Sequence, residues 1–164
     1  MVRAMIADTT RGAALWQRIT ALPNSRFLML GTPNLGSYEA VRWLTGHNPT
    51  QAKLSLLDLT QSTTDIVNLV RKFPGLVELL PFDDESPDFS QRTRWQEIKD
   101  SVRARWRTPT EGVLRKAQST WALLRESPPD PRHMIYVAGH QKATVADYRL
   151  VPEPGDKDRG SRLE

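Results

Sequence analysis

Residues 26–37, RFLMLGTPNLGS, predict a buried strand followed by a tight turn and the start of a helix. Residues 27–30 form an unbroken apolar run, which is typical of a strand buried on both faces in a parallel sheet. Gly31 and Gly36 permit the turn, and Ser37 is suited to cap the first turn of the helix that follows. A chain with this feature therefore combines helices with a parallel sheet.

The remainder of the chain is patterned mainly as helix. Apolar residues recur at helical spacing over residues 2–20 and 38–45, and again through most of residues 48–131. Residues 134–137, MIYV, predict a second buried strand, and residues 162–164 resemble the beginning of another. The long helical segment exceeds an ordinary crossover between strands, so we interpret it as an insertion.

Composition limits the class of protein. The 164 residues suit one domain, 38% are hydrophobic and five are Trp, which favours a packed core over disorder. No apolar run is long enough to span a membrane, and residues 1–20 lack the plan of a signal peptide, so a cytoplasmic location is the default expectation. The chain has no cysteine, which excludes disulfides and thiolate ligands.

The residues that catalysis commonly uses are few. The three histidines are His47, His133 and His140, and none lies in a recognisable motif. His140 follows a predicted strand, where catalytic groups often lie, although a loop histidine is more often a polar surface residue. No serine occupies a GxSxG elbow, so the chain itself offers no triad.

Two further stretches resemble ligand sites only superficially. GTPNLGS follows a strand and precedes a helix, as phosphate-binding loops do, but it lacks the lysine of a P-loop and the GxGxxG spacing. Asp83, Asp84, Glu85 and Asp88 lack the spacing of a calcium loop. We therefore interpret the first as a structural turn and the second as a solvated loop, and we expect no cofactor and no metal.

The segment RTRWQEIKDSVRARWR combines basic and aromatic residues. Arg92, Trp95, Arg103, Arg105 and Trp106 are the residues that would contact an acidic partner or single-stranded nucleic acid in a stand-alone helical binding module. The alternative is an amphipathic helix with its tryptophans directed inward and its charges outward. We favour this second interpretation.

The order of these elements resembles the alpha/beta hydrolases of the bacterial lipase and lecithin:cholesterol acyltransferase type. The stretch FLMLGTPNLGS is similar to the strand and GTPxxGS turn that lead into the lid of those enzymes, and FPGLVELLP is similar to a lid segment. VRAMIAD resembles the helix that follows their nucleophile, and MIYVAG resembles the strand that resumes their sheet. The likeness covers residues 2–151, with GTPNLGS and FPGLVELLP as its specific parts.

The resemblance implies an α/β fold, a partial hydrolase sheet with a large helical lid. Residues 1–46 would belong to the core, residues 47–131 to the lid, and residues 132–164 to the resumed core and a truncated tail. The implied activity is acyl transfer on esters or lipids. The nucleophile would precede residue 1 and the acid and histidine would follow residue 164, so we expect this chain alone to be inactive. Thr32 and Asn34 are the candidate substrate-pocket residues.

Overall fold

The computed structural model describes residues 2–7, 10–57, 60–84, 86–127, 129–139, 145, 147–152 and 161–163. The chain forms two compact units. The first unit contains residues 1–34 and 118–144, and the second contains residues 35–117 and 145–164.

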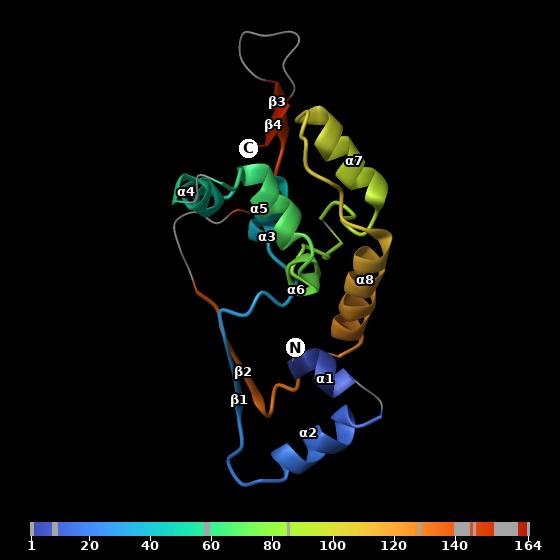
Figure 1. The fold of residues 1–164 in the computed structure, drawn as a ribbon. Coiled ribbons are helices and arrows are strands. Elements are labelled where there is room, and N and C mark those ends of the chain that lie inside the picture. Colours follow the sequence, from blue (N-terminus) through green and yellow to red (C-terminus); the bar gives the residue numbers. More distant parts are fainter. Residues whose placement is uncertain are drawn as a thin grey trace. The chain divides into compact units, whose positions relative to one another are not determined.

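In the first unit, two helices lie to one side of a short parallel sheet (Figure 1). The elements are α1 (Val2–Ala7), α2 (Gly12–Thr20), β1 (Phe27–Leu30), β2 (Met134–Val137) and the second part of α8 (Glu111–Glu126). Strand β1 pairs with β2 in parallel, with Phe27 opposite Met134 and Leu30 opposite Val137. The two predicted strands are therefore confirmed, and they are hydrogen-bonded neighbours.

One face of this sheet is covered and the other is not. Met29 and Met134 are buried, and the ring of Trp16 on α2 meets the ring of Phe27 edge to face at 6.4 Å between centroids. The residues on the opposite side of the strands are exposed: Leu28, Leu30, Ile135 and Val137. The prediction that the apolar run is buried on both faces is thus wrong, because no described element of this unit covers the second face.

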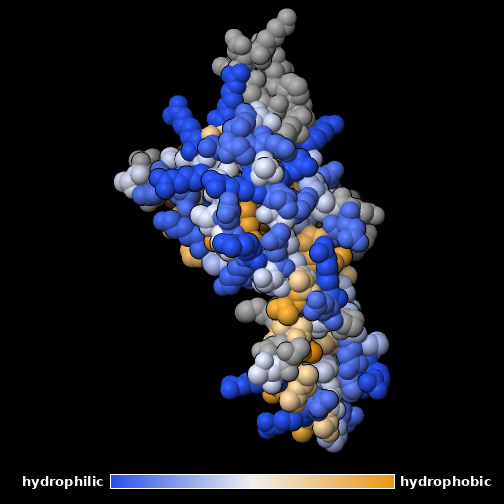
Figure 2. Space-filling view, turned by 90° about the vertical axis from the view of Figure 1, so that its right-hand side faces the viewer, coloured by the Kyte–Doolittle hydropathy of each residue, from blue (hydrophilic) through white to orange (hydrophobic). Residues whose placement is uncertain are grey.

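The second unit is built from helices. Its elements are α3 (Tyr38–Thr45), α4 (Pro49–Leu57), α5 (Thr63–Val70), α6 (Pro74–Glu78), α7 (Arg92–Ser101) and the first part of α8, followed by β3 (Leu150–Pro152) and β4 (Ser161–Leu163). Strands β3 and β4 are antiparallel. The core contains Leu44, Leu80, Phe89, Trp95 and Ile98, each almost completely shielded from solvent. Figure 2 shows small apolar patches between charged side chains on the surface.

The predicted fold class, a partial alpha/beta-hydrolase sheet with a large helical lid, is wrong. The described residues are mostly helical, with one parallel pair of strands and one short antiparallel pair. The physical reason lies in the apolar pattern. Residues 27–30 and 134–137 are continuous apolar runs that form parallel strands, whereas the apolar residues between them stand mainly at helical spacing and pack as helices.

Candidate functional site

Helix α3 begins and ends as its sequence dictates. The Ser37 side chain accepts a hydrogen bond from the backbone N–H of Glu39, at 3.2 Å, and so caps the first turn. Gly46 ends the helix in the left-handed conformation, with φ of 82°. Both termini are therefore fixed locally, and the side chains of α3 are placed on defined faces.

The turn before α3 is joined to a segment more than 40 residues further along the chain. The backbone N–H of Ser37 donates to the carbonyl of Leu79 at 2.7 Å, and the N–H of Phe82 donates to the carbonyl of Leu35 at 3.3 Å. Gly36 lies between these bonds with φ of 85°, and a Cβ there would stand 2.2 Å from the carbonyl oxygen of Leu80. Only glycine allows so close an approach of the two backbones. The GTPNLGS turn and the FPGLVELLP segment thus form one junction.

A cavity of about 340 Å³ opens along α3. Tyr38, Val41, Arg42 and Thr45 line it at helical spacing, together with His47 just after the helix and with Val145, Asp147 and Tyr148 from a later segment. We call this space the α3 cavity. Its volume lies in the range of small-molecule sites, and its mixture of apolar walls and a few polar groups is typical of them.

The histidine of the α3 cavity has a defined tautomer. The Thr45 hydroxyl donates its proton to the carbonyl of Val41 at 2.8 Å, and the same hydroxyl oxygen lies 3.1 Å from Nδ1 of His47. Thr45 has a single hydroxyl proton, and we assign it to the shorter contact, with the Val41 carbonyl, which makes Nδ1 of the imidazole the donor in the second bond. In the neutral imidazole, Nε2 then carries the lone pair, and no described residue donates a hydrogen bond to it.

The electrostatic surroundings keep this imidazole neutral. Burial lowers the pKa of His47 below its ordinary value of 6.5, a hydrogen bond with the backbone of Thr45 opposes this effect, and the charge of Arg42 adds to the lowering. Arg42 is itself neutralised, because its Nη1 lies 2.8 and 3.0 Å from the two carboxylate oxygens of Glu39. At neutral pH the cavity therefore presents an uncharged acceptor next to a paired cation.

A buried arginine fixes the end of α3 from the other side. Arg71 donates through Nε, at 3.0 Å, and through Nη2 to the carbonyl of Leu44, and its guanidinium lies 3.9 Å from the ring centroid of Trp106. Burial lowers the pKa of Arg71 to about 9. Nη1 is buried without a hydrogen-bond partner among the described residues. Arg71 therefore stabilises the C-terminal turn of α3 at a cost in desolvation.

A second cavity, of about 280 Å³, adjoins the first and shares Thr45 and His47 with it. Its wall includes Thr63 and Thr64 at the start of α5, as well as Arg105 and Trp106. It is more polar than the α3 cavity. His47 thus stands between two hollows, with access to both.

The two residues predicted to line a substrate pocket belong to the first unit. The carbonyl of Thr32 accepts a hydrogen bond from the Tyr136 hydroxyl at 2.9 Å, and the side-chain amide of Asn34 lies 4.0 Å from the sulfur of Met29. Neither residue lines either of the two cavities above. Their assignment to a substrate pocket stays a prediction.

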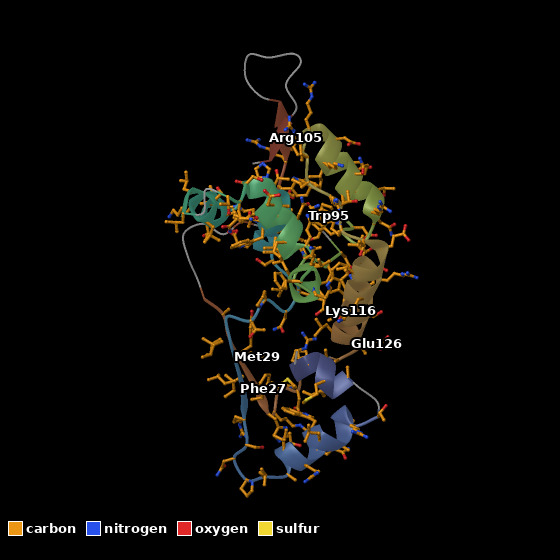
Figure 3. The ribbon with its side chains drawn as sticks, viewed as in Figure 1. Phe27, Met29, Trp95, Arg105, Lys116 and Glu126 are labelled. Carbon is orange, nitrogen blue, oxygen red and sulfur yellow. The ribbon has the colours of Figure 1, made fainter. Side chains whose placement is uncertain are left out.

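The tryptophans of the basic and aromatic segment RTRWQEIKDSVRARWR are directed inward. Trp95 is completely buried on α7 and its indole N–H donates to the carbonyl of Phe89 at 2.8 Å, while Trp106 is buried beyond the helix end. Arg92, Arg103 and Arg105 are exposed, and Figure 3 shows Arg105 beyond the end of the ribbon of α7. The indoles are therefore not free to stack on bases, and the interpretation of an amphipathic helix with inward tryptophans is confirmed for Trp95.

The other candidate groups form no site within the described residues. Nδ1 of His133 lies 2.8 Å from a carboxylate oxygen of Asp130 in the turn before β2, and this bond lowers the pKa of Asp130. His140 and Glu85 lie outside the described residues. Among the residues that are described, no cluster of His, Asp or Glu could hold a metal ion, and no helix has the length and apolar character needed to cross a membrane.

Sequence reasoning considered His47 only as one histidine among three and did not identify the α3 cavity. The available signal was the spacing of Tyr38, Val41, Arg42 and Thr45, which places aromatic, aliphatic and polar side chains along one face of a helix. Comparisons of the chain with protein-family models, curated proteins and solved structures found no match.

Proposed function

We propose that this chain is the substrate-binding part of a serine esterase, lipase or acyltransferase that acts on an ester or lipid. In this proposal the acyl group is carried on a serine outside residues 1–164, with a histidine base and backbone oxyanion donors also supplied from outside them. The chain contributes the surface that receives the substrate.

The junction between GTPNLGS and FPGLVELLP carries this proposal. These two segments are the specific parts of the resemblance to lipases and acyltransferases. Their backbones meet at Ser37–Leu79, and Leu35 bonds to Phe82 directly after the second segment. A glycine-dependent contact holds the two segments together. Their pairing supports the interpretation of both as parts of one functional arrangement.

The α3 cavity gives the proposal a place for substrate. Helix α3 begins directly after the junction, so the geometry of the turn sets the position of Tyr38 and of the side chains that follow it on the same face. The walls of the cavity suit the apolar part of an ester, and its few polar groups suit orientation of the polar part.

The experiment compares the 164-residue chain with a chain extended on both sides by the flanking coding sequence. A fluorophosphonate probe, which labels activated serines, should label the extended chain at one serine and should leave the 164 residues unlabelled. Turnover of nitrophenyl butyrate should follow the same pattern. Labelling or turnover by the 164 residues alone, or an extended chain that is neither labelled nor active, would refute the proposal.

A further inference from the structure

We infer that the α3 cavity binds a neutral aromatic alcohol, whose hydroxyl group donates a hydrogen bond to Nε2 of His47. The inference rests on the proposed function and deepens it, because it names the free alcohol that the acyl-transfer reaction releases or acylates as the molecule that this cavity holds. Three features of the cavity lead to it: one acceptor, the balance of charge and the kind of wall.

The acceptor is set by a chain of hydrogen bonds. The carbonyl of Val41 accepts a hydrogen bond from the Thr45 hydroxyl, and the Thr45 oxygen accepts one from Nδ1–H of His47. Nε2 of the imidazole therefore keeps its lone pair. A ligand that meets this nitrogen must bring a proton of its own. A hydroxyl does so, whereas an ether, an ester carbonyl or a carboxylate does not.

The balance of charge disfavours an anionic ligand. The lining contains one cation, Arg42, and one anion, Asp147. Arg42 is held by both oxygens of Glu39, and one oxygen of Asp147 accepts the backbone N–H of Tyr148 at 2.7 Å. No described group in the lining is an unpaired cation that would hold a carboxylate.

The walls favour a flat ring over a branched chain. Tyr38 and Tyr148 line the cavity with aromatic surface, and both rings are fixed against the buried Phe89, with centroids 6.2 and 5.8 Å from it. The hydroxyl of Tyr38 is held by that of Ser86 at 3.1 Å. Ring surfaces immobilised in this way bind another ring at a small entropic cost, and aromatic pairs contribute beyond simple burial.

The test titrates the purified full chain with four naphthalene probes by calorimetry: naphthol, methoxynaphthalene, naphthoate and aminomethylnaphthalene. We expect naphthol to bind most tightly, by about tenfold over methoxynaphthalene, because capping the hydroxyl leaves Nε2 without a donor. Equal binding of these two probes, tighter binding of either charged probe, or no binding of naphthol would each overturn the inference.

Two variants assign the preference to His47. His47→Phe keeps a ring but removes the acceptor, so naphthol and methoxynaphthalene should bind it equally. His133→Phe, in the first unit, is the matched control and should keep the tenfold preference. A preference that survives in His47→Phe would overturn the inference, and the four-probe series on the unaltered chain decides the matter if this variant does not fold.

Thr45 acts in this scheme as a positioning residue. Thr45→Val should shift the imidazole toward the other tautomer and reduce the preference for naphthol, whereas Thr45→Ser should retain it. The ring nitrogen signals of His47 in NMR report the tautomer directly, which a purely structural role of Thr45 would not move. Serine labelling of the extended chain without naphthol binding by this chain would refute the inference and leave the proposed function intact.

Discussion

At the scale of single residues, Gly36 has the strictest requirement in the second unit. Gly36→Ala forces a side chain into the left-handed region and places Cβ at 2.2 Å from the Leu80 carbonyl oxygen. The strained conformation alone costs about 1–3 kcal/mol, and the clash with a backbone atom adds to it. We expect a loss of at least ~2 kcal/mol in the free energy of unfolding, measured by urea denaturation.

Gly75→Ala is the matched control for this substitution. Gly75 lies in helix α6, and a Cβ there would meet no atom within 4 Å. Alanine is the better helix former, so the control should keep or slightly raise stability. If Gly36→Ala unfolded at the same urea concentration as Gly75→Ala, the close junction between the two backbones would be disproved.

Arg71 is the residue whose role depends most on the shape of its side chain. Arg71→Lys should lower the free energy of unfolding by about 1–3 kcal/mol, since an ammonium cannot both stack flat on Trp106 and donate twice to the Leu44 carbonyl. The exposed neighbour Lys72 provides the control, because Lys72→Arg should change stability little. Equal stability of the two variants would show that the planar contact contributes nothing.

Residue patterns predicted local features and missed distant ones. The cap at Ser37, predicted from short-range chemistry, is confirmed, and the end of the helix at Gly46 is equally local. The tautomer of His47 could not be predicted from a sequence pattern, because it depends on which acceptor the Thr45 hydroxyl proton faces. The stack of Arg71 on Trp106 joins residues that lie 35 positions apart. Helical or strand periodicity in the sequence does not predict a contact between residues so far apart.

At the scale of elements, β1 separates covered from uncovered apolar residues. Met29→Ala should lower the free energy of unfolding by about 2–4 kcal/mol, because Met29 is only 4% exposed and its removal leaves a cavity. Leu30→Ala, one residue further on, should cost less than about 1 kcal/mol, because Leu30 is 67% exposed. Equal costs, measured by urea denaturation of the two variants, would mean that both faces of the strand are covered in solution.

Strand β1 also shows what the sequence cannot predict about an element. Four consecutive apolar residues identify a strand but not the number of its covered faces, which depends on what packs against the sheet. The helices followed their sequence periodicity more closely, since the burial of Trp95 and Ile98 on α7 needs only one apolar face.

At the scale of the whole molecule, the chain forms two units and the α3 cavity belongs wholly to one of them. The boundaries at residues 46 and 131 are implied by the resemblance to the hydrolases and stay a prediction. The contact units divide after residues 34, 117 and 144, so that α8 contributes to both. A continuous helical period contains no signal at the point where its neighbours change, so the sequence offers no sign of the division within α8.

Global stability should depend on pH through His47. Its pKa is lowered in the folded state, so the unfolded chain binds the proton more readily. The contribution of His47 to stability is thus complete above its unfolded pKa of about 6.5 and is lost as the pH falls from there through the folded value. His47→Gln does not titrate. As the pH falls from about 7 to about 5, the urea midpoint of the original chain should therefore decrease relative to that of the variant.

Comparing the two proteins removes the contribution of the carboxylates to the pH dependence, because these groups titrate alike in both. Asp65 and Asp130 both have lowered pKa values, chiefly through hydrogen bonds from Ser62 and His133, so each also loses its contribution to stability at lower pH. Without the comparison, their effect would be confused with that of His47. A pH-independent difference between the two proteins would mean that His47 is as accessible to protons when folded as when unfolded. The neutral acceptor in the α3 cavity would then have no basis at acidic pH.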